Sequence, residues 1–424
     1  MARSVENRPL ARHLPLGGSG GSAHRPRPVM RRALHQAIGA AALSAALRAP
    51  FPAGSAEARV AGRKSVDDIL SLDVVHLIEI RADPTNLHFL DEDRSVKVSC
   101  EVTIDGERYA DANFTEKGSI GSSSTLAGKP GFNIRFGKER PTGMKKLTIN
   151  NSQQDVTFLH EHLAYELYRR GGMAAPRTAH GLMTLNERPY GLYVMVEPKD
   201  DLFLERSFGK DNAAGNLYDF NVSDFVDNLY DPTRVALKDS DDESSDVNRE
   251  KRADLQALAD VVRGAANDEL AAAIGLRLDL DQFIAAYAID SLMAHWDGPI
   301  FNTNNYYLYD KPADGRFVLL PHGADQVFDS TYDPLTPPTM LLARRIRAIP
   351  ELDRQLRDAM NWVMSDVWIV DVLLARIAQV RKVLGAVKTS DAAAARDISW
   401  FQDFGAGVGE QLDARKARWL RQPF

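Results

Sequence analysis

Residues 295–302 read His-Trp-Asp-Gly-Pro-Ile-Phe-Asn and stand where a long apolar run of helical spacing, 280–295, gives way to two strand-like runs within 305–320. An aspartate followed five positions later by an asparagine in a helix-to-strand loop is the spacing of a phosphotransferase catalytic loop. In that chemistry the aspartate orients or deprotonates an acceptor hydroxyl, and the asparagine oxygen ligates a metal ion that neutralises phosphate charge. The spacing therefore predicts Asp297 as a catalytic residue and Asn302 as a metal ligand.

A second carboxylate comes just past the later strand-like run, in the sequence Pro321-His322-Gly323-Ala324-Asp325. A kinase-like site keeps another metal-binding carboxylate at such a place. Carboxylate oxygens suit Mg²⁺ or Mn²⁺, hard cations that share their coordination shell with substrate phosphates. Either aspartate alone is better explained as a helix or turn cap. Because the two flank one hairpin, we expect Asp325 to bind metal near Asp297.

The first half of the chain supplies groups suited to a nucleotide. The run 117–124, Lys-Gly-Ser-Ile-Gly-Ser-Ser-Ser, is a loop whose backbone N–H groups could cover phosphates, although it is neither a Walker loop nor Gly-x-Gly-x-x-Gly. Lys129 precedes a strand-like run, and Glu161 lies on the helix expected over 155–170. A lysine held by a helix carboxylate can bind the α- and β-phosphates. We expect Lys129 and Glu161 to form that pair, with Glu166 as the alternative carboxylate and an ordinary surface lysine as the alternative reading.

The remaining pattern divides the chain into a β-rich first half and a helical second half. Alternation of apolar and polar residues predicts strands, and apolar residues three and four apart predict helices. A β-rich lobe followed by a helical lobe with a short hairpin is a two-lobed α+β arrangement, and ligands tend to bind between such lobes. The expected strands are 74–80, 95–104, 132–136, 178–185, 190–196, 305–309 and 316–320, and the expected helices are 155–170, 202–208, 253–273, 280–295, 339–359, 369–384 and 390–420.

Composition excludes several classes of protein. The 424 residues include 52 Lys and Arg against 58 Asp and Glu, which gives a formal net charge of −6. Since no basic stripe interleaved with aromatic residues accompanies that charge, we expect no nucleic-acid partner. The single cysteine, Cys100, excludes an intramolecular disulfide and a cysteine-based metal cluster, and it is typical of a small buried side chain in a strand.

The first sixty residues differ from the rest. Residues 1–29 are rich in Arg, Pro, Gly and Ser, and Met30-Arg31-Arg32 then precedes an apolar run, 37–47, and small residues over 54–58. This is the order of a secretory signal, although an alanine-rich leader without export is the alternative. The apolar run is too short to cross ~30 Å of hydrocarbon. We therefore expect a leader and signal over 1–58, with Met30 as a candidate start, and an exported protein without a stable transmembrane segment.

Further motifs follow one another in a fixed order between about 73 and 328. They are Lys117-Gly118-Ser119 with Gly121-Ser122, Lys129-Pro130, Lys146-Leu147-Thr148-Ile149-Asn150-Asn151-Ser152 with Gln154-Asp155, Leu159 with Glu161, Gly191-Leu192-Tyr193 with Glu197, Gly215-Asn216-Leu217-Tyr218, His295-Trp296-Asp297-Gly298 with Asn304-Asn305-Tyr306, and Pro321-His322-Gly323 with Asp325 and Phe328. In this set and order the chain resembles the CotH family of spore-coat and secreted kinase-like proteins.

The resemblance implies an atypical protein-kinase fold in a domain spanning 66–420, with a β-rich N-lobe over about 73–197 and a helical C-lobe over about 198–420. It implies that the protein binds ATP with Mg²⁺ or Mn²⁺. It also implies that the acceptors are Ser or Thr side chains of secreted or envelope proteins.

Matched residue by residue, the family pattern assigns Lys129 as the nucleotide-phosphate lysine and Glu161 as its helical partner. Lys117 and Ser119 belong to the ATP-binding loop, and Glu197 lies on the strand leading to a hinge whose backbone groups hold adenine.

The same match assigns Asp297 as the catalytic aspartate, with Asn302 and Asp325 as metal ligands. Asn305 is the alternative to Asn302, because the Asn-Tyr pair of the family is Asn305-Tyr306 here. Many members carry Trp-Asp-Leu-Asp where this chain has His-Gly-Ala-Asp over 322–325, so one carboxylate is absent and the number of metal ions is left open.

Three functions are consistent with these residues. The first is an exported ATP- and metal-dependent protein kinase. The second keeps the nucleotide site but transfers AMP or an amino acid such as glutamate, since a fold does not fix the chemistry of its site. The third is a non-catalytic envelope or adhesion protein, against which the presence of Lys129, Asp297, Asn302 and Asp325 together argues.

Overall fold

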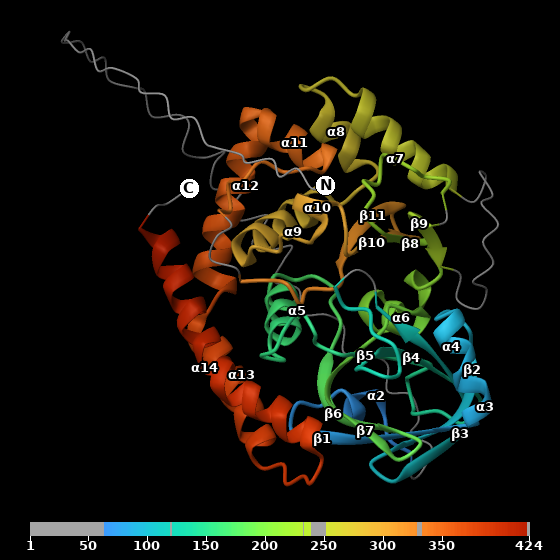
Figure 1. The fold of residues 1–424 in the computed structure, drawn as a ribbon. Coiled ribbons are helices and arrows are strands. Elements are labelled where there is room, and N and C mark those ends of the chain that lie inside the picture. Colours follow the sequence, from blue (N-terminus) through green and yellow to red (C-terminus); the bar gives the residue numbers. More distant parts are fainter. Residues whose placement is uncertain (1–62, 119–120, 232, 239–251, 329–332, 422–424) are drawn as a thin grey trace, which may run out of the picture. The chain divides into compact units, whose positions relative to one another are not determined.

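The computed structural model describes residues 63–118, 121–231, 233–238, 252–328 and 333–421 (Figure 1). All of them belong to one structural unit, 45–424. The expected leader and signal over 1–58, including Met30, lie outside the described residues.

Seven strands of the first lobe close into a barrel with the order β1-β2-β3-β4-β5-β7-β6 (Figure 1). Neighbouring strands are antiparallel except β1 and β6, which are parallel. Side chains alternate along β1 between the interior and solvent, and the interior is filled by apolar residues such as Ile78, Phe114 and Leu147. The strands are β1 Val75–Ala82, β2 Val98–Ile104, β3 Glu107–Lys117, β4 Gly131–Phe136, β5 Lys146–Asn150, β6 Thr178–Leu185 and β7 Arg188–Val196.

Short helices accompany the barrel, and one longer helix, α5 (His160–Arg170), packs against the second lobe. The sequence predicted α5 from residue 155, but Asp155 folds into a turn before the helix. Its carboxylate accepts hydrogen bonds from the backbone N–H of Thr157 and of His160, at 2.9 and 2.8 Å, and so occupies donors near the helix start. The short helices are α2 Val66–Ile69, α3 Pro84–Leu87 and α4 Phe89–Glu92.

The second lobe contains a four-stranded sheet of order β11-β10-β8-β9. The sequence predicted only the hairpin of β10 (Tyr306–Lys311) and β11 (Arg316–Pro321). The two strands it missed, β8 (Leu217–Phe220) and β9 (Val235–Lys238), have four residues each. Such runs are too short for alternation to distinguish a strand from a loop.

Helices surround this sheet (Figure 1). The expected helix 253–273 is divided into α7 (Ala253–Gly264) and α8 (Leu270–Gly275), and 339–359 is divided at Pro350, which stands in the first turn of α12. The other helical segments are α6 Asp201–Phe208, η1 Lys210–Asn212, α9 Leu280–Met293, α10 Pro299–Asn302, α11 Leu341–Ala348, α12 Pro350–Trp362, η3 Val363–Val367, α13 Val370–Gly385 and α14 Ala392–Leu420.

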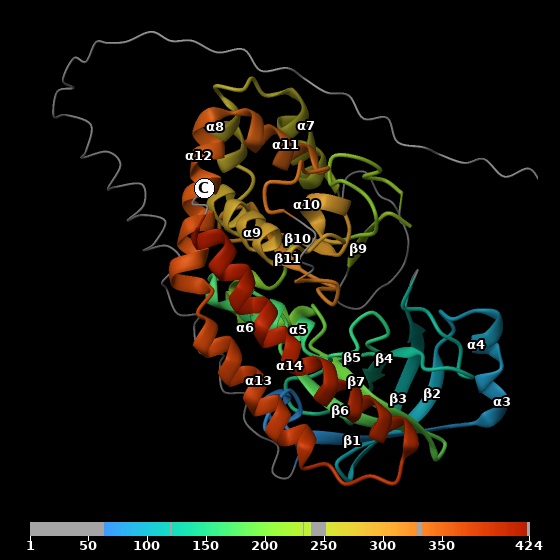
Figure 2. The same cartoon turned by 60° about the vertical axis from the view of Figure 1, so that its left-hand side comes forward.

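The α+β fold class predicted from the sequence is confirmed, with a β-rich lobe followed by a helical lobe that carries a small sheet. The last two helices, α13 and α14, lie side by side (Figure 2), and α14 also contacts β7 of the barrel. None of the helices in the described part of the chain is long and apolar enough to cross a membrane.

Candidate functional site

A cavity of about 630 Å³ lies between strands β3–β5 of the barrel and the sheet of the second lobe. Its size is within the range of small-molecule sites, which is ~300–1,000 Å³. The barrel contributes Lys117 and Asn150, from the ends of β3 and β5, and the second lobe contributes Tyr307 and His322. Polar and charged groups from both lobes therefore converge on one cavity.

Lys117 and Glu161 are joined through one amide side chain. The Lys117 Nζ donates a hydrogen bond to Asn150 Oδ1 at 2.5 Å, and Asn150 Nδ2 donates to Glu161 Oε2 at 2.5 Å. Tyr165, one turn along α5, donates to the other Glu161 oxygen at 3.1 Å. Burial and the nearby Asp325 carboxylate raise the pKa of Glu161, while Lys117 and these two hydrogen bonds oppose the shift. The amide thus fixes a lysine beside a buried helix carboxylate.

Lys129 does not form the expected pair with Glu161. Its Nζ lies 2.7 Å from Asp397 Oδ2 and 4.9 Å from the ring centroids of both Phe158 and Tyr193. Burial lowers the pKa of Lys129, and the Asp397 carboxylate opposes that shift. The lysine that reaches Glu161 through Asn150 is Lys117, because the Lys129 ammonium is directed to α14 and β7 instead.

The alternative carboxylate, Glu166, also has other partners. Its Oε2 lies 3.2 Å from Arg169 Nη2 and 3.6 Å from Arg376 Nη2. Neither candidate glutamate therefore contacts Lys129.

The Asp297 carboxylate is surrounded by three asparagine amides. Asn302 Nδ2 donates to Oδ1 at 2.5 Å, Asn304 Nδ2 to the same oxygen at 3.2 Å, and Asn305 Nδ2 to Oδ2 at 2.9 Å. The segment folds back on itself because Thr303 and Asn305 adopt left-handed backbone angles, with φ of 48° and 54°. One short helical turn, α10, thus brings together the expected catalytic aspartate and both asparagines considered as metal ligands.

Asp325 follows β11 in the chain, and its carboxylate interacts electrostatically with both Lys117 and Glu161. Burial raises the pKa of the Asp325 carboxyl, and Lys117 opposes the shift. The main-chain oxygen of Asp325 contacts His160 Nδ1 at 2.7 Å, which ties this segment to the start of α5.

The buried His295 contacts a third aspartate, Asp290, with Nδ1 3.1 Å from Oδ1. Burial acts to lower the pKa of His295, but its hydrogen bond to Asp290 and the charges of Asp290, Asp297 and Asp325 raise the pKa above its ordinary value. The negative charges of Asp297 and Asp325 therefore both act on this imidazole.

Asp325 and Asn302 carry oxygen donors that fit a hard divalent cation. Asp325 offers carboxylate oxygens and Asn302 an amide oxygen, which suit Mg²⁺ or Mn²⁺ that completes its shell with phosphate oxygens and water. Among the residues described, no group of three or more His, Cys, Asp or Glu is arranged to hold a metal ion.

A family model described as "CotH kinase protein" matches residues 120–405. The chain belongs to the CotH family. A curated relative, "Inner spore coat protein H-like protein" of Bacillus subtilis (strain 168), is 25% identical over 234 residues, which is 54% of this chain and 65% of the relative. The match thus spans slightly less than two thirds of that relative. The resemblance noted in the sequence is confirmed, and CotH membership supports a kinase-like protein.

Two solved structures are similar to this CotH chain, both with low TM-scores. The first is the HipA, HipB and operator DNA complex of Shewanella oneidensis MR-1, with a TM-score of 0.33, 13% identity, and coverage of 80% of this chain and 72% of that chain. The second is the proinflammatory kinase CtkA of Helicobacter pylori, with a TM-score of 0.26, 9% identity, and coverage of 71% and 95%.

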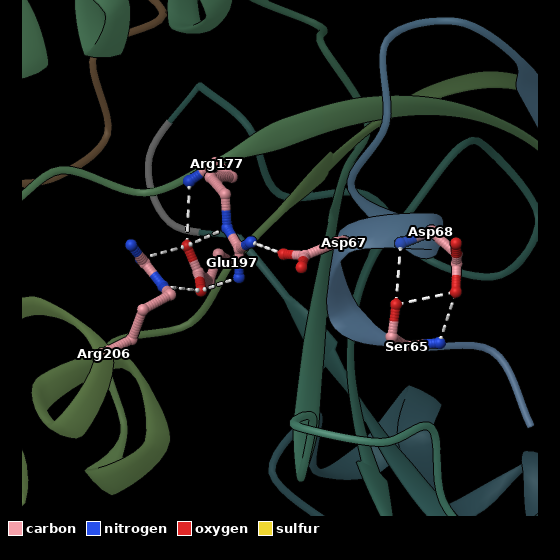
Figure 3. A network of polar contacts seen from close by, with 6 residues as sticks. All are labelled: Ser65, Asp67, Asp68, Arg177, Glu197 and Arg206. Atoms are coloured by element: carbon pink, nitrogen blue, oxygen red, sulfur yellow. Dashed lines mark hydrogen bonds and ion pairs between the residues drawn. The ribbon is translucent and has the colours of Figure 1, made fainter. Parts of the chain in front are cut away.

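In this CotH chain the carboxylate of Glu197 is occupied by two arginines (Figure 3). Arg177 Nη2 donates to Oε1 at 2.8 Å, and Arg206 Nη2 donates to Oε2 at 2.7 Å. Burial acts to raise the pKa of Glu197, but the two guanidinium groups hold it below its usual value. Arg177 also pairs with Asp67 on α2. The Glu197 carboxylate therefore holds Arg177 and Arg206 together where the chain passes from the barrel to the second lobe. Glu197 also lines the cavity.

The glycine- and serine-rich loop is only partly described, and Ser119 lies outside the described residues. Asn151 Nδ2 donates to Ser122 O and to Lys129 O, both at 2.8 Å. The loop is therefore fastened at Asn151, next to the Asn150 amide that contacts Lys117.

Sequence reasoning missed a buried lysine of the CotH cavity, Lys199. Its Nζ lies 3.2 Å from His322 Nδ1 and 4.7 Å from the ring centroid of Tyr307. Burial lowers the pKa of Lys199 to about 7. Burial and the Lys199 charge hold the pKa of His322 well below its usual value. No sequence signal marked Lys199, and His322 was noticed as part of a family motif and as a departure from the family pattern, with no role assigned to it.

Proposed function

We propose that the protein is an ATP- and metal-dependent phosphotransferase of the kinase type that modifies Ser or Thr side chains of exported proteins. The observation that supports this most is a cavity lined by Lys117 and Asn150, whose amide bonds the buried Glu161, with the Asp325 carboxylate acting electrostatically on Lys117 and Glu161. Asp297 and Asn302 lie on the segment before β10 of the second lobe, whose sheet lines the same cavity. Positioning and charge stabilisation account for most of the catalysis in phosphoryl transfer, and these groups supply both.

In this proposal Lys117 binds the α- and β-phosphates, the role that the sequence assigned to Lys129. Asn150 and Glu161 keep the Lys117 ammonium on the cavity wall. Asp325 and Asn302 hold Mg²⁺ or Mn²⁺, which neutralises the charge on the phosphate oxygens when bound. Lys199 is a further lysine lining the same cavity.

The transfer itself takes place at Asp297. Its carboxylate, oriented by three asparagine amides, accepts the hydrogen bond of the acceptor hydroxyl. The hydroxyl oxygen forms a bond to the γ-phosphorus as the bond to the β-phosphate oxygen breaks, ADP leaves, and the hydroxyl proton passes to Asp297. Asp297 is therefore the catalytic residue of the proposal.

Export is proposed from residues 1–58, on the order of basic, apolar and small residues in that part of the sequence. The mature protein is then expected outside the cytoplasm, beginning after the small-residue run. N-terminal sequencing of protein made by the native host tests this point. A mature chain that retains residues 1–29 contradicts it.

The proposed chemistry is tested by intact-mass measurement of purified protein incubated with ATP and Mg²⁺ or Mn²⁺, with and without a Ser/Thr-rich acceptor protein. Gain of one phosphate supports the proposal. Gain of AMP, or of glutamate when glutamate is added, assigns the other transfer chemistry to the same site. No gain, together with no rise in melting temperature with ATP and metal, contradicts a nucleotide site. A ligand at one hundred times its dissociation constant should stabilise the fold by ~2.7 kcal/mol.

A further inference from the structure

Helix α14 (Ala392–Leu420) runs alongside α13 (Figure 2) and forms hydrogen bonds with both lobes of the molecule. Near its start, Asp397 contacts the barrel, and near its end Arg415 and Lys416 contact the helical lobe. The family model ends at residue 405, so the second set of contacts lies beyond the matched part of the chain.

The contact with the barrel is a buried, fully bonded carboxylate. Asp397 is 0% exposed, and its Oδ2 accepts hydrogen bonds from Lys129 Nζ at 2.7 Å and from the backbone N–H of Leu192 at 3.0 Å. A Cβ built on Gly191 would stand 2.5 Å from the same oxygen, so the glycine lets the carboxylate approach β7. The other oxygen, Oδ1, accepts from Arg396 Nη2 at 2.9 Å, so the carboxylate has a second cation. Since a buried charge without a partner is costly, the mostly buried Lys129 ammonium depends on Asp397 more than Asp397 depends on Lys129.

From Lys129 the contacts continue to the cavity wall. The backbone N–H of Lys129 donates to Ser124 Oγ at 2.9 Å, and its carbonyl oxygen accepts from Asn151, which also bonds the loop at Ser122. The residue before Asn151 is Asn150, whose amide bonds both Lys117 and Glu161. Asp397 is thus connected to Lys117 although neither Asp397 nor Lys129 lines the cavity.

The contact with the helical lobe is made at the end of α9. Arg415, 7% exposed, donates from Nε to the carbonyl oxygen of Leu292, and Lys416 Nζ donates to the carbonyl oxygen of Trp368 at 2.6 Å. Leu292 is in the last turn of α9, where carbonyl groups have no partner within the helix. The chain then turns at Ala294 (φ 56°) and enters the segment that carries Asp297.

We propose that α14 is a strut that holds the barrel and the helical lobe together, with Asp397 as a positioning residue for the phosphate-binding loop next to the cavity and Arg415 as a positioning residue for the catalytic segment. The proposal rests on the proposed function in one respect, namely that ATP is the ligand of the cavity. It assigns Asp397 a role through Lys129 and Asn151, without contact to the nucleotide.

The test compares Asp397→Asn with the matched control Asp413→Asn, an exposed aspartate on the same helix. For Asp397→Asn we expect the KM for ATP to rise about tenfold while kcat falls less than about threefold, because binding geometry is lost but Asp297 is intact. Asp413→Asn should match the wild type. In a double-mutant cycle, Lys129→Met combined with Asp397→Asn should raise KM no more than either change alone, since both act through one contact.

A merely structural role would lower the melting temperature of Asp397→Asn and leave its KM for ATP at the wild-type value, and that result overturns the proposal. If Asp397→Asn does not fold, the double variant K129M/D397N, which leaves no buried charge unpaired, is compared with wild type in its place.

Hydrogen exchange of the ATP-free protein separates this proposal from the proposed function. Asp397→Asn should increase exchange in 121–131 and 146–151 relative to Asp413→Asn. Unchanged exchange there overturns the strut. If the wild type binds no ATP but the exchange difference is found, the proposed function fails while the strut stands.

Discussion

Lys117 and Lys129 stand at the two ends of one glycine- and serine-rich loop, yet their surroundings are opposite. The Lys117 ammonium lines the cavity and is held by a neutral amide. The Lys129 ammonium is paired with a fully buried carboxylate and packed against two aromatic rings. An ammonium already neutralised by its own carboxylate has little charge to offer a ligand, whereas one held by an amide keeps it. We therefore expect Lys117 to bind a ligand and Lys129 to support the fold.

The largest effects are expected for variants of Asp297 and Asp325. Asp297→Ala should reduce phosphate transfer by about 10²–10⁴-fold, because the group that accepts the hydroxyl proton is lost. Asp325→Asn should likewise abolish metal-dependent transfer while the melting temperature changes little. Both are read by transfer of labelled phosphate from ATP, with Asp413→Asn as the control. Wild-type transfer by either variant contradicts its assigned role.

The next prediction compares the stability of variants that lack one or the other of the two lysines. Lys129→Met removes one of the two cations of the buried Asp397 and leaves Arg396 Nη2 at 2.9 Å, so we expect the free energy of unfolding to fall by less than the ~3–5 kcal/mol of a fully broken buried pair. Lys117→Met should cost less than about 1 kcal/mol, because its contact is with a neutral amide beside an open cavity. Urea unfolding of the two variants measures both values. A larger loss of stability for Lys117→Met would reverse the comparison.

A smaller effect is expected at the amide between Lys117 and Glu161. Asn150→Ala removes one hydrogen bond to each neighbour, so the KM for ATP should rise about tenfold with kcat less affected. Asn113→Ala, on the same wall of the cavity, serves as a control, since no bond from Asn113 to Lys117 or Glu161 is among those described. Equal KM values for the two variants would show that the amide does not position the lysine.

The smallest effect concerns the buried lysine of the cavity, Lys199. Its pKa is lowered to about 7 in the folded protein, so between that value and its usual pKa of about 10.4 the unfolded chain binds more protons. The contribution of Lys199 therefore makes the free energy of unfolding rise with pH across this window. Lys199→Met should be more stable than wild type at pH 7, with the difference shrinking toward pH 10. Urea titrations at several pH values test the slope, and parallel curves contradict the shift.

The local part of the site could be predicted from the sequence. Asp297 and Asn302 are close in the chain and contact each other through one helical turn, so their spacing already implied proximity. The β-rich lobe and the helical lobe followed from periodicity. The helix after residue 155 was predicted too early because Asp155 forms a turn that precedes it.

The distant part could not be predicted. Lys129 and Asp397 are 268 residues apart in the sequence. A lone aspartate in a helical run gives no sign that it will be buried against the barrel. Without that contact, the family pattern and the position of Lys129 before a strand were the only guides to its role. The carboxylate of Glu197 is likewise committed to Arg177 and Arg206 by contacts that no local spacing reveals.

The most direct measurement is calorimetric titration of ATP with Mg²⁺ into the wild type, Lys117→Met and Lys129→Met, each under conditions where the variant is folded. We predict binding by the wild type, a loss of affinity of about 100-fold for Lys117→Met, and a loss of about tenfold for Lys129→Met, where 1.4 kcal/mol corresponds to each factor of ten. Full affinity in Lys117→Met with binding lost in Lys129→Met would contradict the account.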